Sequence, residues 1–183
     1  MHKRFVFVRE DRPEVEWLAR FTAGRDDACR WYLGDRRTTP STTGSAGPRL
    51  DWYKGAGRGD PPTAVECRVA LHRYLPELLP HYDRVCAMVG RDELDHCILS
   101  HYRPPPEAAG CTLALWHGEG GPALVRQQDF PLDMVSDRFE MTDWSGRRVI
   151  GKAQRPWGGL HDGINDDGLV VTSTFGGAPV LSR

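Results

Sequence analysis

Apolar residues recur at helical spacing in the first part of the chain. After the acidic start "DRPE", Val15, Leu18 and Phe21 lie three residues apart, and Gly24 follows as a helix stop. The segment "AVECRVALHRYLPELLPHYDRVCAMVG" continues this pattern, and its two prolines predict two short helices or one kinked helix. "RDELDHCILSHYR" predicts a further helix that ends at the prolines after it.

The pattern changes at residue 111, where strand-like segments replace helical ones. "CTLALWH" and "GPALVRQQDF" flank the turn "GEGG" and predict a β-hairpin. "RRVIGKAQ" and "GLVVTSTFGG" predict further strands, whereas "PLDMVSDRFEM" has a weak helical pattern. The order predicts an α+β fold, with a mostly helical segment over residues 1–110 and an antiparallel sheet in residues 111–183. Residues 37–63 are rich in Ser, Thr, Gly and Pro and predict a flexible loop.

Composition and charge narrow the class of protein. The 183 residues are 39% hydrophobic and 27% charged, which is typical of a soluble globular protein. The net charge of −1 gives no reason to expect nucleic acid or an anionic membrane as a partner. The chain has no run of 18 apolar residues, and its short N-terminal apolar run is not a secretory signal, so we expect a cytoplasmic protein.

The cysteine pattern argues against disulfides and metal sites. The odd number of cysteines and the lack of a C-x-x-C pair argue against a disulfide framework and a structural zinc site. Phosphate-binding and dinucleotide-binding motifs are also missing, so we expect neither a metal nor a cofactor. The five cysteines are Cys29, Cys67, Cys86, Cys97 and Cys111. Cys111 stands out because it follows Gly110 where the strand pattern begins.

Cys111 would become a self-sufficient nucleophile if the bond before it were cut. A free N-terminal cysteine carries a thiol and, in its α-amine, a base of similar pKa, so no separate histidine is needed. Gly110 lacks a Cβ and can adopt the strained backbone that lets the thiol attack its carbonyl. The predicted hairpin returns Arg126 and Asp129 toward Cys111. There the carboxylate can orient the amine, and the guanidinium can stabilise a thiolate or bind an acyl carbonyl.

Packing explains the same residues without any chemistry. A cysteine that opens an apolar strand is more often a buried packing residue than a nucleophile. Arg126 and Asp129 can form a surface pair of little energetic weight. His117 and His161 are candidates for a Cys–His pair, but no feature of the sequence orients either imidazole. From residue chemistry alone, packing is favoured.

Three segments in order, "GCT", "VRQQDF" and "DGINDDGLVVTSTFGG", resemble the autoproteolytic N-terminal-nucleophile acyltransferases and hydrolases. This family includes isopenicillin N acyltransferase-like proteins, choloylglycine hydrolases and penicillin V acylases. In it a Gly–Cys bond cleaves itself, and the new N-terminal cysteine attacks linear amides. The resemblance covers about residues 65–177 and implies an αββα sandwich. It implies Cys111 as the nucleophile, Arg126 and Asp129 as a charged pair, and residues 162–169 as a turn before a strand.

The sequence also departs from the family pattern. Gln127 and Gln128 stand where the family usually has an asparagine beside the arginine. Thr174 and Phe175 stand where a later strand often carries an oxyanion-binding asparagine, so a backbone N–H or the Thr174 hydroxyl is the candidate oxyanion donor. Residues 111–183 are too few for the whole sandwich, so we expect an incomplete nucleophile subunit that a second chain or the other half of the enzyme completes.

The sequence therefore predicts a cysteine acyltransferase or amidohydrolase that acts on linear C–N amide bonds after self-cleavage at Gly110–Cys111. A small-molecule amide or acyl substrate is the expected partner, and Asn165 is expected to be structural. One alternative is a truncated, inactive fragment of such an enzyme that acts at most as a binding or assembly partner. Another is an unrelated α+β binding module with a chance "GCT" sequence.

Overall fold

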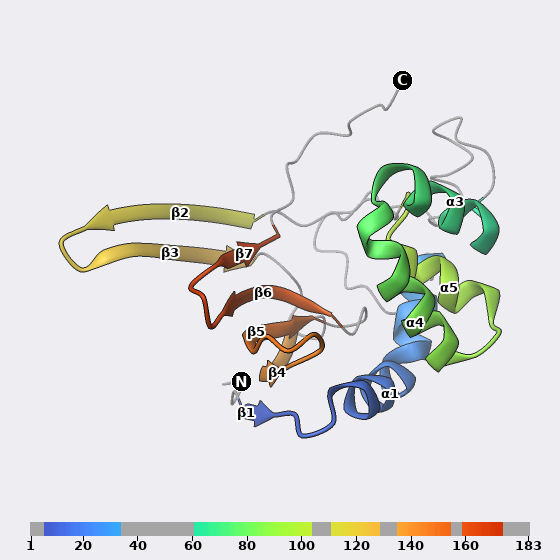
Figure 1. Cartoon of the computed structure of the whole chain (residues 1–183), viewed down its shortest axis with the longest axis horizontal. Coiled ribbons are helices and arrows are strands. Elements are labelled where there is room, and N and C mark those ends of the chain that lie inside the picture. The colour runs from blue at the N-terminus through green and yellow to red at the C-terminus, as the bar shows by residue number, and fades with distance from the viewer. Residues whose placement is uncertain (1–5, 34–60, 104–110, 129–134, 155–158, 174–183) are drawn as a thin grey trace, which may run out of the picture.

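The computed structural model describes residues 6–33, 61–103, 111–128, 135–154 and 159–173. The helices gather on one side and the strands on the other (Figure 1), so the predicted α+β class is confirmed. The helical elements are α1 (Pro13–Leu33), α3 (Ala64–Tyr74), the 3-10 turn η1 (Pro76–Leu78), α4 (Leu79–Val89) and α5 (Glu93–Ser100). The strands are β1 (Val6–Arg9), β2 (Cys111–Gly118), β3 (Gly121–Gln128), β4 (Val135–Thr142), β5 (Val149–Gln154), β6 (Leu160–Asn165) and β7 (Val170–Thr172).

The predicted break in the second helical segment is confirmed. Helix α3 ends at Tyr74, and Pro76 opens a 3-10 turn before α4 begins. The start of α3 is fixed by a capping box. Thr63 Oγ1 accepts from the Glu66 backbone N–H at 3.2 Å, and the Glu66 carboxylate accepts from the Thr63 N–H at 2.8 Å.

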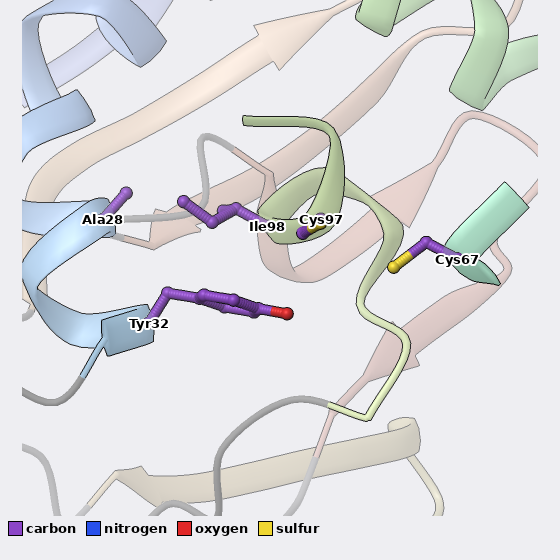
Figure 2. Close-up of a cluster of buried hydrophobic side chains, with 5 residues drawn as sticks. All are labelled: Ala28, Tyr32, Cys67, Cys97 and Ile98. Atoms are coloured by element: carbon purple, nitrogen blue, oxygen red, sulfur yellow. The ribbon is translucent and has the colours of Figure 1, made fainter. Parts of the chain in front are cut away.

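Helix α1 is longer than predicted, because its second half also buries apolar side chains. The expected stop at Gly24 is wrong: this glycine lies inside the helix. Ala28 and Tyr32, beyond it, are 0% and 3% exposed. Their burial outweighs the cost of about 1 kcal/mol for a glycine in a helix interior. The cluster that they join consists of Ala28, Tyr32, Cys67, Cys97 and Ile98 (Figure 2).

Trp144, in the turn between β4 and β5, connects the helices to the sheet. It packs against a second buried cluster that contains Trp17 and Phe21 of α1 and Val85 of α4. The rings of Trp17 and Trp144 meet edge to face, with centroids 5.9 Å apart. The sheet and the helical part therefore share an apolar contact.

A buried ionic cluster adds a second connection between helix and sheet. Arg20 of α1 forms ion pairs with Glu10, which follows β1, and with Glu140 of β4, the latter at 3.1 Å. Both carboxylate side chains are almost fully buried. Burial is the largest cause that raises the pKa of Glu140, and Arg20 opposes it.

The larger sheet has the strand order β1-β4-β5-β6-β7. Strands β4 to β7 are antiparallel, as predicted, but β1 lies parallel to β4, so the sheet is mixed. The weak helical interpretation of "PLDMVSDRFEM" is wrong, since its second half forms β4. The buried positions of β4 are polar, namely Ser136, Glu140 and Thr142. The alternation of apolar residues that marks a strand is therefore missing there.

The predicted hairpin is confirmed as the two-stranded sheet of β2 and β3, which extends away from the helices (Figure 1). Gly121 has a φ of 92° at the turn, a conformation that favours glycine. The predicted boundary between residues 1–110 and 111–183 stays a prediction, although β1 from the first segment pairs with β4 from the second. Residues 37–60 of the predicted loop lie outside the described part.

Candidate functional site

The hairpin register brings Cys111 and Arg126 to the same face. Cys111 pairs with Gln128, and Leu113 pairs with Arg126. Because alternate residues of a strand share a face, the side chains of Cys111, Leu113 and Arg126 lie on one side of the hairpin. Arg126 Nη2 donates to Cys111 Sγ at 3.2 Å.

Arg126 is the centre of a network that joins four strands. Its side chain is 6% exposed. Nη1 donates to Asp162 Oδ1 and, at 3.0 Å, to Thr172 Oγ1. Nη2 donates to Cys111 Sγ and to Nε2 of His161. The four Nη hydrogens thus reach groups on β2, β6 and β7, while Arg126 itself lies on β3.

The pairing of β6 with β7 positions the Asp162 and Thr172 side chains of this network. Asp162 and Thr172 are cross-strand partners, and Thr172 Oγ1 donates to Asp162 Oδ1. Asn165 holds the turn between the two strands, because its Oδ1 accepts from the backbone N–H of Asp167 at 3.1 Å and of Leu169 at 2.8 Å. Asn165 therefore has a structural role.

Gly151 of β5 permits the close approach of β6 that places Asp162. A Cβ at this glycine would lie 2.4 Å from the Asp162 carbonyl oxygen. That separation is shorter than two unbonded atoms allow, so a side chain here would displace β6. The position of the Asp162 carboxylate thus depends on a glycine in the neighbouring strand.

Burial and the neighbouring Arg126 charge favour the neutral form of His161. Burial lowers the pKa of His161, and the Arg126 charge lowers it further, while Asp162 and a hydrogen bond with the Ser173 backbone oppose the shift. The Arg126 charge itself is balanced by the Asp162 carboxylate, which is 30% exposed. Arg126 Nε is buried and has no hydrogen-bond partner among the residues that the structure describes.

Comparison with protein families gives one match. The model of the family described as acyl-coenzyme A:6-aminopenicillanic acid acyl-transferase matches residues 116–182. The family resemblance is confirmed. The matched segment contains Arg126, His161, Asp162 and Thr172; it begins within β2 and does not include Cys111. No curated protein and no solved structure gives a significant match to the chain.

The similarity to this acyltransferase family supports an acyltransferase-type function in general terms. Of the candidate site residues, Cys111 and Arg126 lie in the described part and contact each other. Gly110, Asp129, Thr174 and Phe175 lie outside it.

Sequence reasoning missed Asp162 and Thr172 as site residues, since Asp162 was interpreted as a turn residue. It named His161 as a candidate for a Cys–His pair but had no feature that oriented the imidazole. The strand–turn–strand pattern around Asn165 carried a signal, because a tight antiparallel turn places Asp162 opposite Thr172. The pattern gave no sign that this pair would face Arg126.

Other kinds of site are not seen in the described ranges. No group of three or more His, Cys, Asp or Glu side chains there could hold a metal ion. No helix in these ranges is long and apolar enough to cross a membrane. All five cysteines are free thiols, and three of them, Cys67, Cys86 and Cys97, are buried.

Proposed function

We propose that this chain is a cysteine acyltransferase or amidohydrolase that acts on linear C–N amide bonds, with Cys111 as its nucleophile. The observation that carries the proposal is the hydrogen bond from Arg126 Nη2 to Cys111 Sγ, made by a guanidinium that three other groups hold in place. A buried, fixed cation at a sulfur stabilises the thiolate that attacks a carbonyl carbon. The family match to residues 116–182 supports acyl transfer as the class of reaction.

The first reaction would be self-cleavage at Gly110–Cys111. The thiol sulfur attacks the Gly110 carbonyl carbon, the C–N bond breaks, and the thiol proton passes to the Cys111 nitrogen. A thioester then joins residue 110 to the Cys111 sulfur. Water then hydrolyses the thioester and releases Cys111 with a free α-amine. The chain has now acquired a base beside its nucleophile.

In turnover the α-amine of Cys111 would take the thiol proton, and the thiolate would attack the substrate amide. The leaving amine receives that proton, and the acyl group stays on sulfur until water or another amine accepts it. Asp129 would orient the α-amine. The Thr174 hydroxyl, or a backbone N–H at Thr174 or Phe175, would donate to the oxyanion. Arg126 would hold the thiolate or the acyl carbonyl.

Asp162 and Thr172 would hold the Arg126 guanidinium in the position that catalysis needs. A guanidinium with free rotation would have to be ordered in each catalytic cycle, which raises the barrier. Here both Nη1 hydrogens are taken by Asp162 and Thr172, so Nη2 faces Cys111 without further ordering. We regard these two as positioning residues, because they act through Arg126.

The intact mass of the purified chain tests the proposal. The uncut chain has a mass of 20.6 kDa. We expect two fragments that separate between Gly110 and Cys111, and a single uncut species in Cys111→Ala. Cys29→Ala is the matched control, because Cys29 and Cys111 are the two cysteines that are not fully buried. The Cys29 variant should cleave like the parent, and the cleaved protein should then hydrolyse a linear amide.

An uncut parent after long incubation with a reductant would contradict self-cleavage. It would favour the second candidate function, a binding or assembly partner without catalysis. Exposed apolar side chains on both faces of the hairpin favour that role: Leu115 is 72%, Trp116 62% and Val125 68% exposed. A stable homodimer or larger complex of the uncut chain in light scattering would support it.

A further inference from the structure

We propose that His161 accepts the thiol proton of Cys111 in the uncleaved chain and so acts as the base of self-cleavage. This inference rests on the proposed function. Before cleavage the Cys111 nitrogen belongs to the peptide bond with Gly110, and its lone pair is delocalised into the carbonyl. It cannot take up a proton at neutral pH. The α-amine that would serve in turnover therefore does not exist when the first bond is cut.

The geometry places an imidazole beside the thiol. Cys111 Sγ and His161 Nε2 both contact the same nitrogen, Arg126 Nη2, the sulfur at 3.2 Å. The two hydrogens of a planar NH₂ group diverge, so the atoms bound to them lie roughly 4–5 Å apart, a separation that one water molecule can bridge for proton transfer. Transfer requires the ring to exchange its bond with Arg126 for a bond with that water.

The imidazole is in the state that a base needs. Burial first, and the Arg126 charge second, lower the pKa of His161, so the ring is neutral at pH 7. Nε2 faces Arg126, and a guanidinium can only donate, so Nε2 offers its lone pair in this contact. A hydrogen bond with the Ser173 backbone favours the protonated ring. The charged groups around it are Arg126, Asp162 and Lys152.

The reaction balances in protons and electrons, and water is the only added reagent. His161 Nε2 takes the thiol proton, and the sulfur forms a bond to the Gly110 carbonyl carbon. The C–N bond breaks, and the imidazolium returns its proton to the Cys111 nitrogen, which becomes the α-amine. Arg126 donates to the sulfur throughout and stabilises its negative charge. Water then cleaves the thioester, and nothing is oxidised or reduced.

Asp162 is less suited to this task than His161. A carboxylate is a weaker base than a neutral imidazole. Asp162 Oδ1 also already accepts from Arg126 and from Thr172. Its role in the network is to balance and hold the guanidinium.

The test compares His161→Ala with the parent and with His117→Ala, which changes an exposed histidine near the far end of β2. Cleavage at Gly110–Cys111 is followed by intact mass between about pH 5 and pH 8, with and without added imidazole. We expect His161→Ala to cleave roughly 100-fold more slowly, as for the loss of a general base. Imidazole should restore part of the rate, and His117→Ala should behave as the parent. The parent rate should fall as the pH drops through the pKa of His161, because only the neutral ring accepts a proton.

Each of the other possible outcomes refutes either the role of His161 as the base or self-cleavage itself. If His161→Ala cleaves at the parent rate, the inference is wrong and the proposed function stands. If it is slow at every pH and imidazole restores nothing, His161 only positions Arg126, and its role as the base is refuted.

If the parent does not cleave, self-cleavage fails, and the reactivity of the Cys111 thiol decides the inference separately. The rate of iodoacetamide alkylation at Cys111 is then measured at pH 6 by peptide mapping. If the imidazole takes the thiol proton, this rate should be at least about tenfold lower in His161→Ala than in the parent. Equal alkylation rates would overturn the inference.

Discussion

Replacing Arg126 by alanine should loosen the β2–β3 hairpin from the other strands. A hairpin of two strands is only marginally stable by itself. Arg126 reaches from this hairpin to His161 and Asp162 on β6 and to Thr172 on β7. The guanidinium therefore carries much of the attachment of the hairpin to the rest of the protein.

The magnitude follows from the burial of the two charges. Removal of one partner of a buried ion pair costs about 3–5 kcal/mol. The Arg126 side chain is 6% exposed, but Asp162 is 30% exposed, so water solvates part of the carboxylate that is left behind. This lowers the cost of losing the pair to about 2 kcal/mol. The lost hydrogen bond to Thr172 adds about 1 kcal/mol. We expect Arg126→Ala to lower the free energy of unfolding by about 3 kcal/mol.

Urea unfolding followed by tryptophan fluorescence measures this loss. With a slope of about 2 kcal/mol per M, the midpoint should fall by about 1.5 M. Arg148→Ala is the control, because Arg148 is 63% exposed and lies 3.8 Å from an exposed Asp166 carboxylate. Such a surface pair contributes about 0–1 kcal/mol.

If the urea midpoint of Arg126→Ala equals that of Arg148→Ala and the hairpin also stays attached, the predicted loss of stability is refuted. Amide hydrogen exchange over residues 111–128 tests the attachment directly. We expect faster exchange there in Arg126→Ala than in the parent, even if the helical part unfolds at the same urea concentration. Unchanged exchange in the hairpin would show that other contacts hold it.

Two further predictions concern stability outside the site. Asp92→Ala should cost about 1 kcal/mol in a thermal melt, because Asp92 caps α5 by accepting from the Leu94 N–H at 3.0 Å. Asp92→Asn should keep most of that stability; an equal loss in both variants would mean that the ion pair of Asp92 with Arg25 matters instead. Burial raises the pKa of Glu140, so the folded state holds this proton more tightly than the unfolded state. The stability from this group is therefore present below about pH 4.3 and is lost as the pH rises through the raised pKa. Glu140→Gln should flatten that decline in urea unfolding between about pH 4 and pH 7, and an unchanged slope would contradict the assignment.

The fold was predictable from the sequence where local signals decide it. The hairpin was predicted because glycines at its turn separate two strand-like segments, and the break between α3 and α4 because proline cannot continue a helix. Prediction failed where distant contacts override local preference. Gly24 did not end α1, since Ala28 and Tyr32 are buried against helices that come much later in the chain. Strand β4 was missed because its buried residues are polar and form no apolar face; one of them, Glu140, pairs with Arg20.

The candidate site, too, was predicted in part from the sequence and in part seen only in the tertiary structure. The sequence by itself named Cys111 and Arg126, through a Gly–Cys junction, a hairpin and a family resemblance. It predicted that the hairpin returns Arg126 toward Cys111, because the turn lies within a short stretch of chain. The register that puts both side chains on one face was given by the structure. Only the tertiary structure decided that His161, Asp162 and Thr172 meet Arg126. The packing of the hairpin against β6 and β7 depends on contacts between residues far apart in the chain, and no local pattern encodes which side chains of two separate strands will face one another.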